Sequence, residues 1–142
     1  MSTNSSITIK YYQKIKPTHI IEKLLQTGWC INDYGKIYYL PLGDVDFEWQ
    51  STDLSNWNTV KTILFQKEQK EETIGISLVF KNTRIGFLLN CLSDSPKSIT
   101  LSLMINRAVI KGTSITDFSW YLNRLTVLIT DLTESIECFD CY

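Results

Sequence analysis

The chain has 142 residues, 44% of them apolar and 20% charged, and a formal net charge of −1. This length and apolar fraction exclude a disordered chain and predict one domain, residues 1–142, that needs no disulfide or metal to fold. No apolar run reaches the roughly 20 residues of a membrane-spanning helix, the first residues lack the apolar segment of a signal peptide, and near-zero charge argues against a nucleic-acid binder. We therefore expect a cytoplasmic protein with no membrane or nucleic-acid partner.

The first part of the chain predicts a strand, a helix and a β-hairpin. Residues 7–12 are β-branched and aromatic, which favours a strand. Pro17 is placed to begin a helix whose apolar residues fall on one face, and Gly28 is placed to end it. Residues 29–31 and 36–40 flank a glycine-containing turn and predict a hairpin.

The middle of the chain predicts a second helix and a second hairpin. A helical period begins after Asp53, although residues 62–66 are equally compatible with a strand. The charged residues 67–72 favour a solvated turn. Residues 74–80 and 85–90 alternate in polarity about a short turn and predict the clearest hairpin of the chain.

The last part predicts a strand, a long helix and an edge strand. Residues 99–105 alternate apolar and hydroxyl side chains, which is typical of a strand with one buried face. Apolar residues recur at helical spacing through residues 116–132, and the alternation in residues 133–142 favours an edge strand. Together these elements predict an α+β fold: an antiparallel meander of about five or six strands with two or three helices packed on it.

Charge is unevenly distributed along the chain. Residues 1–30 and 61–111 carry net charges of +3 and +4, whereas residues 31–60 and 112–142 each carry −4. The two acidic segments are either ordinary solvated surface, cancelled in space by the basic segments, or a surface that attracts a basic partner.

No arrangement of residues indicates catalysis or a metal centre. Cys138 and Cys141 form a C-x-x-C pair, but no second ligand pair accompanies it. Cys30 and Cys91 lie in apolar segments typical of buried thiols. The single histidine, His19, excludes a histidine-based metal site. We predict no catalytic residue, no metal and no cofactor.

Several segments resemble the small immunity proteins of contact-dependent growth inhibition systems. The segments that carry the resemblance are YLPLGD at 39–44, FEWQ at 47–50, the paired strands at 74–80 and 85–89, LSLMINR at 101–107 and TDFSWYL at 116–122. The resemblance implies a cytoplasmic bacterial protein, not an enzyme, that binds and neutralises the C-terminal toxin domain of a cognate effector, often a nuclease.

Nuclease toxins are basic because their substrate is a polyanion, so an acidic and aromatic surface suits such a partner. We predict a one-to-one complex with a basic toxin domain through six partner-binding residues: Asp44, Asp46, Glu48, Trp49, Asp53 and Trp57. The two tryptophans alternatively anchor this segment to the core, and residues 131–140 form a second acidic candidate surface. The alternative function is a homodimeric secretion chaperone that binds an effector protein.

Overall fold

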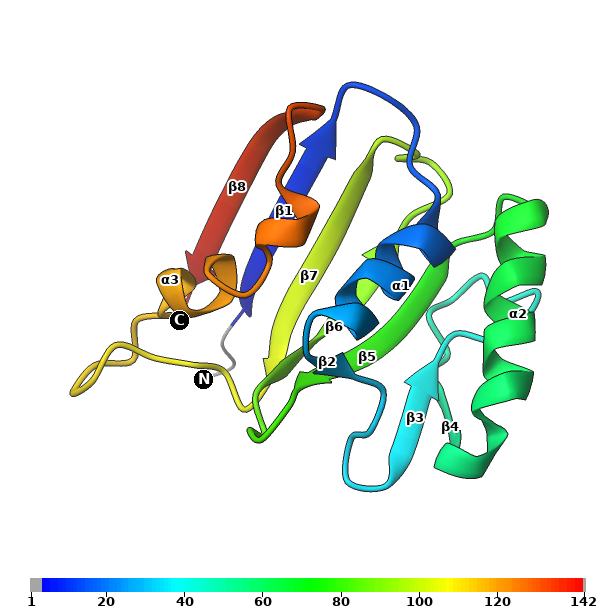
Figure 1. Ribbon diagram of the computed structural model, residues 1–142, viewed down its shortest axis with the longest axis horizontal. Helices are drawn as coiled ribbons and strands as arrows, with labels where there is room; N and C mark the ends of the chain where they lie inside the picture. Colours follow the sequence, from blue (N-terminus) through cyan, green and yellow to red (C-terminus); the bar gives the residue numbers. More distant parts are fainter. Residues whose placement is uncertain (1–3, 142) are drawn as a thin grey trace.

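The computed structural model describes residues 4–141, which form one α+β domain on a single antiparallel sheet. The strands are β1 (Asn4–Tyr11), β2 (Trp29–Cys30), β3 (Lys36–Tyr39), β4 (Gln50–Asp53), β5 (Ile74–Phe80), β6 (Gly86–Cys91), β7 (Ser98–Ile105) and β8 (Thr133–Cys141). The helices are α1 (Pro17–Gln26), α2 (Trp57–Gln69) and α3 (Phe118–Leu122), with short 3-10 segments η1 (Leu54–Asn56) and η2 (Thr126–Leu128). Figure 1 shows α1 and the α3–η2 segment across one face of the sheet, with α2 beside α1 near the β4 edge.

The predicted α+β class is confirmed, but the sheet has eight strands rather than five or six. The strand order is β4-β3-β5-β6-β7-β1-β8, and β2 also pairs with β5. Only β5, β6 and β7 form the predicted meander, because β1 lies between β7 and β8 and so joins the two ends of the chain. Within residues 4–141, no helix combines the length and apolar character needed to cross a bilayer.

The turn of the predicted hairpin is present, and its Gly35 adopts the expected positive φ, 81°. The predicted pairing of residues 29–31 with residues 36–40 is wrong. Strands β2 and β3 do not form a ladder with each other. Each pairs instead with β5, through Trp29 and Tyr39 respectively. Pairing with the central sheet leaves Trp29 only 1% exposed, and an isolated two-stranded hairpin has no comparable core in which to bury an indole.

The core lies between the sheet and its helices. One fully buried row crosses four neighbouring strands: Ile7 of β1, Leu101 of β7, Leu89 of β6 and Ile76 of β5. Each such side chain contributes about 1.5–3 kcal/mol through removal from water. The Trp29 ring packs beside Phe87 at a centroid distance of 4.5 Å and beside Trp120 of α3 at 6.2 Å, which joins β2, β6 and α3 in one aromatic cluster.

The predicted long helix over residues 116–132 is wrong, because α3 has five residues and η2 is separate from it. Asp117 begins α3 by accepting a hydrogen bond from the Trp120 backbone N–H. The Trp120 carbonyl then accepts from the Arg124 guanidinium at 2.9 Å, and the Arg124 carbonyl accepts from the Trp29 indole at 2.9 Å. The backbone N–H groups of Arg124 and Leu125 donate to the carbonyls of Tyr121 and Leu122, three residues earlier, so the four-residue pattern of an α-helix ends here. Some of the apolar residues that predicted the long helix are nevertheless buried, namely Tyr121, Leu125 and Leu128.

The edge strand expected in residues 133–142 is confirmed as β8, although residue 142 lies outside the described residues. A polar cluster holds its end against β1. The Asp140 carboxylate accepts hydrogen bonds from the Ser5 hydroxyl and from the Thr116 hydroxyl and backbone N–H, the latter two at 2.6 and 3.0 Å. Partial desolvation opposes a low pKa for Asp140, but these hydrogen bonds prevail and hold the pKa below its ordinary value.

We expect the variant Asp140→Asn to be less stable than the wild type at pH 7 by about 1 kcal/mol, because it weakens hydrogen bonds to a half-buried carboxylate. The Asp140 pKa is lowered on folding, so its contribution is present above the ordinary pKa and is lost as pH falls through the folded value. Urea unfolding at neutral pH and near pH 3 should therefore show the two proteins converging in acid. A constant difference would contradict this, and Asp131→Asn, at an exposed site, is the control.

Candidate interaction site

The connection from β3 to β4, residues 40–49, is here called the acidic loop. It is seated on β5 by two side chains at its ends. An added Cβ on Gly75 would lie 2.7 Å from the side chains of Leu40 and Trp49, so these two side chains fill the space above that glycine. Because Ile74 and Ile76 belong to the core beneath the helices, Trp49 lies on the opposite face of the sheet.

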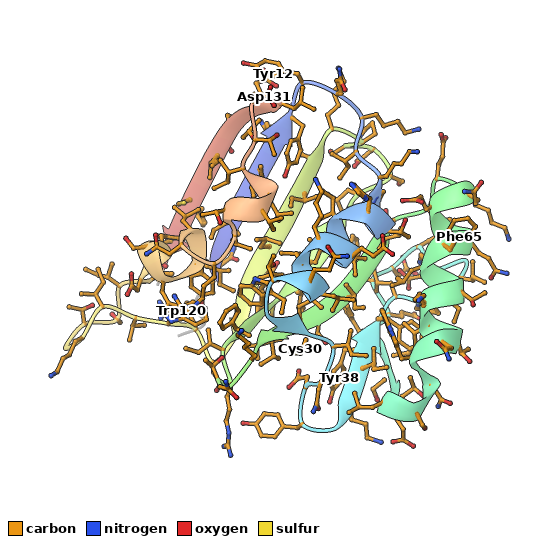
Figure 2. The ribbon with its side chains drawn as sticks, in the orientation of Figure 1. Tyr12, Cys30, Tyr38, Phe65, Trp120 and Asp131 are labelled. Carbon is orange, nitrogen blue, oxygen red and sulfur yellow. The ribbon has the colours of Figure 1, made fainter. Side chains whose placement is uncertain are left out.

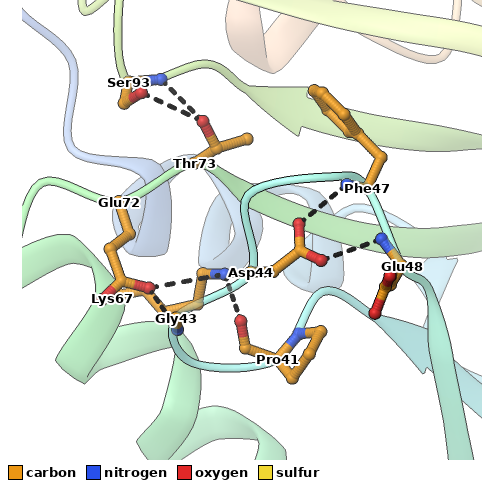
Figure 3. A network of polar contacts seen from close by, with 9 residues as sticks. All are labelled: Pro41, Gly43, Asp44, Phe47, Glu48, Lys67, Glu72, Thr73 and Ser93. Carbon is orange, nitrogen blue, oxygen red and sulfur yellow. Dashed lines mark hydrogen bonds and ion pairs between the residues drawn. The ribbon is translucent and has the colours of Figure 1, made fainter.

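A buried lysine holds the base of the acidic loop (Figure 3). The Lys67 ammonium donates to the Pro41 carbonyl at 2.6 Å and lies 3.8 Å from the Glu72 carboxylate. Glu72 in turn accepts from the Gly43 backbone N–H at 2.8 Å. Desolvation lowers the pKa of Lys67, while the charges of Glu72 and Asp44 act in the opposite direction.

The predicted solvated turn at residues 67–72 is therefore wrong. Helix α2 continues to Gln69, and the Lys67 side chain is fully buried. Glu68 is also engaged, because its carboxylate accepts from the backbone N–H and the hydroxyl of Thr18 at 2.9 and 2.8 Å. These bonds satisfy a free N–H at the start of α1 and join α1 to α2.

Asp44 shapes the interior of the acidic loop. Its carboxylate accepts from the backbone N–H groups of Phe47 at 3.0 Å and Glu48 at 2.8 Å (Figure 3). This arrangement supports the left-handed backbone of Phe47, which has a φ of 56° and is an unusual conformation for an aromatic residue. The loop is thus folded by its own contacts, and Asp44 acts inside it.

The outer surface of the acidic loop combines apolar side chains with carboxylates. Val45 is 84% exposed and Phe47 is 50% exposed, and Leu42 is also exposed. Asp46 and Glu48 are exposed as well, and within residues 4–141 neither carboxylate takes part in a hydrogen bond or ion pair. The loop therefore presents an apolar tip with two free negative charges.

The fold places the six predicted partner-binding residues at different positions. Asp46 and Glu48 lie on the loop surface, whereas Asp44 and Trp49 support the loop from within. Asp53 lies on β4, where its carboxylate pairs with Lys36 at 2.7 Å, and this hydrogen bond lowers the Asp53 pKa.

Trp57 lies apart from the acidic loop. It is half-buried at the start of α2, packs against the helix-side core, and lines a cavity of about 470 Å³ between α1 and α2. The cavity wall also includes Phe65, which projects from α2 (Figure 2), and Leu25 of α1. Trp57 and Trp49 are therefore on opposite faces of the sheet.

Sequence reasoning overlooked the apolar residues of the loop surface and the lysine beneath it. One signal was available for the lysine. Val60, Leu64 and Lys67 follow the four- and three-residue spacing of a single helix face, so position 67 falls on the buried side of α2. No comparable local signal marked Val45 and Phe47 as exposed, because their orientation depends on the turn that Asp44 closes.

The thiols do not form a site. Cys138 and Cys141 lie three residues apart on strand β8, which points their side chains to opposite faces of the sheet. The predicted burial is confirmed for Cys91, where desolvation raises the thiol pKa to about 12, whereas Cys30 is half-buried. Within residues 4–141, no group of three or more histidine, cysteine or acidic side chains could hold a metal ion.

Comparisons of the chain with protein-family models, with curated proteins and with solved structures found no match.

We expect Lys67→Met to loosen the acidic loop, because the variant keeps an apolar side chain but loses the hydrogen bond to Pro41 and the pairing with Glu72. Backbone amides of Phe47 and Glu48 should exchange with solvent roughly tenfold faster, corresponding to one lost hydrogen bond. Native-state hydrogen exchange measures this. Lys70→Met, at an exposed position of the same segment, is the control, and equal exchange in both variants would show that Lys67 does not hold the loop.

Proposed function

We propose that this chain is a bacterial immunity protein that binds and neutralises the C-terminal toxin domain of a cognate contact-dependent growth inhibition effector. It acts by binding and not by catalysis, in the cytoplasm, without a cofactor and in a one-to-one complex. The observation that carries the proposal is the acidic loop, a surface segment fixed by its own contacts that presents apolar side chains beside unpaired carboxylates.

The order of the acidic loop supports tight binding. Lys67 and Asp44 already hold its backbone, so little conformational entropy is lost when a partner docks. Phe47 offers the partner an aromatic side chain, a residue type that is enriched at protein interfaces, and Val45 adds apolar area beside it.

The charge of the acidic loop supports a basic partner. Asp46 and Glu48 add two negative charges that no cation of the described chain neutralises by contact. A nuclease domain carries a basic surface for its polyanionic substrate. Opposite charges on the two proteins accelerate their association, and like charges disfavour complexes with other proteins. The proposed partner is therefore a basic nuclease domain, and the two carboxylates guide its approach.

We expect the double variant Asp46→Lys with Glu48→Lys to weaken the complex by roughly tenfold or more, mainly through slower association. The measurement is the association rate and Kd for the toxic C-terminal domain of the effector encoded directly upstream, together with growth protection on coexpression. The matched control reverses two other exposed acids outside both acidic candidate surfaces, Glu22→Lys with Asp94→Lys.

The outcomes separate the class of protein from the site. If the wild type gives no protection against the upstream toxin domain, the immunity function is wrong. If it protects and the loop variant protects equally well, the function stands but the acidic loop is not the contact surface. Loss of protection in both double variants would indicate a general effect of charge and would also remove the loop as the specific site.

We also expect the free protein to sediment as a monomer and to form a one-to-one complex with the toxin domain. A secretion chaperone, the alternative function, would be a stable dimer at low concentration and would bind an unfolded effector segment. Analytical ultracentrifugation of the protein alone and with the toxin domain distinguishes the two, and a constitutive dimer would contradict the immunity proposal.

A further inference from the structure

Strand β8 ends the sheet with one side unpaired. Residues 135–141 pair regularly with residues 4–10 of β1. Within residues 4–141, the backbone of this stretch forms no hydrogen bond with any other segment. The opposite edge strand, β4, has only four residues and continues directly into η1, so it offers a much shorter row of free backbone groups.

The open edge of β8 lacks most of the features that protect edge strands. It contains no proline, lysine or arginine, and its single irregularity is the extra residue Glu134 near its start. Ile136 and Phe139 point to opposite faces of the strand and are 36% and 53% exposed. A strand added beside β8 would cover part of both side chains while satisfying the free backbone groups.

The open edge of β8 is negatively charged, which favours a basic strand as its partner. Glu134 and Glu137 are exposed, and residues 125–141 contain no lysine or arginine. Among residues 4–141 the one cation in contact is Lys10 of β1, at 3.7 Å from Glu137, and both groups remain exposed. An incoming segment therefore meets a negatively charged edge.

A second copy of this strand brings no cation to the edge, because residues 125–141 contain no lysine or arginine. Antiparallel self-pairing centred on Glu137 would place that residue opposite its own copy and Glu134 opposite Asp140. Like charges directly opposite each other destabilise a strand pair. A segment with lysines or arginines at those positions gains attraction from the same carboxylates.

We propose that the open edge of β8 binds an extended, basic segment of another protein as an added ninth strand of the sheet. Backbone hydrogen bonds along residues 135–141 provide the attachment, and basic side chains of the segment lie beside Glu134 and Glu137. Apolar or β-branched side chains of the segment lie beside Ile136 and Phe139. This inference is independent of the proposed function, because β8 and the acidic loop are at opposite edges of the sheet.

The test uses the reduced protein, residues 1–142, and a nine-residue peptide with lysine at every third position and threonine and valine between, the spacing that separates Glu134 from Glu137 and Ile136 from Phe139. A matched peptide has glutamate in place of each lysine. We expect the lysine peptide alone to shift the backbone NMR signals of residues 135–141 and to slow hydrogen exchange at alternate amides there. The double variant Glu134→Lys with Glu137→Lys should raise the Kd of the lysine peptide roughly tenfold. Asp46→Lys with Glu48→Lys should leave it unchanged.

Three results would overturn the inference. One is equal binding of the two peptides, and another is shifts confined to other elements or no binding at all. The third is protection of the β8 amides in the free protein together with dimeric sedimentation, which would assign the edge to a second copy. The peptide comparison uses only wild-type protein, so the inference remains falsifiable if the lysine variants do not fold.

Discussion

Burial of strand β5 on both faces is the constraint on which the rest of the structure depends. Residues 74–79 are all buried, although β5 belongs to an antiparallel sheet in which one face is commonly solvated. The helices cover one face, and Leu40 and Trp49 cover the other above Gly75. A larger residue than glycine at position 75 would collide with both covering side chains. Glycine at this position therefore allows the acidic loop to pack against β5.

The buried ammonium of Lys67 holds the acidic loop, although burial of a charged group is energetically unfavourable. Removing the Lys67 ammonium from water carries a desolvation penalty, and its lowered pKa reflects that penalty. The Pro41 carbonyl and the Glu72 carboxylate offset part of it, and Glu72 also binds Gly43. The same atoms that compensate the lysine therefore define the path of the loop backbone, which leaves the loop surface ordered and its outer carboxylates free.

The two edges of the sheet differ in character. At the β4 edge the strand has only four residues and continues directly into η1, and the Asp53 carboxylate pairs with Lys36. At the β8 edge the backbone is open, and the Asp140 cluster anchors only the end of the strand. Negative charge thus appears at both ends of the sheet, once on a compact loop and once on an extended strand. The uneven charge distribution along the sequence reflects two separate surfaces and not one.

The sequence by itself determined the elements whose pattern is local. The periodicity of α1, the hairpin of β5 and β6, and the alternation of β7 and β8 appear where predicted, because side-chain spacing alone decides them. The tertiary structure decided the rest. The length of α3, the pairing of β2 with β5, and the opposite placement of Trp49 and Trp57 depend on partners distant in sequence. In the acidic loop, a sequence pattern identified the charges of Asp46 and Glu48, but how the loop presents them depends on the folded contacts, above all the one between Lys67 and the Pro41 carbonyl, 26 residues apart.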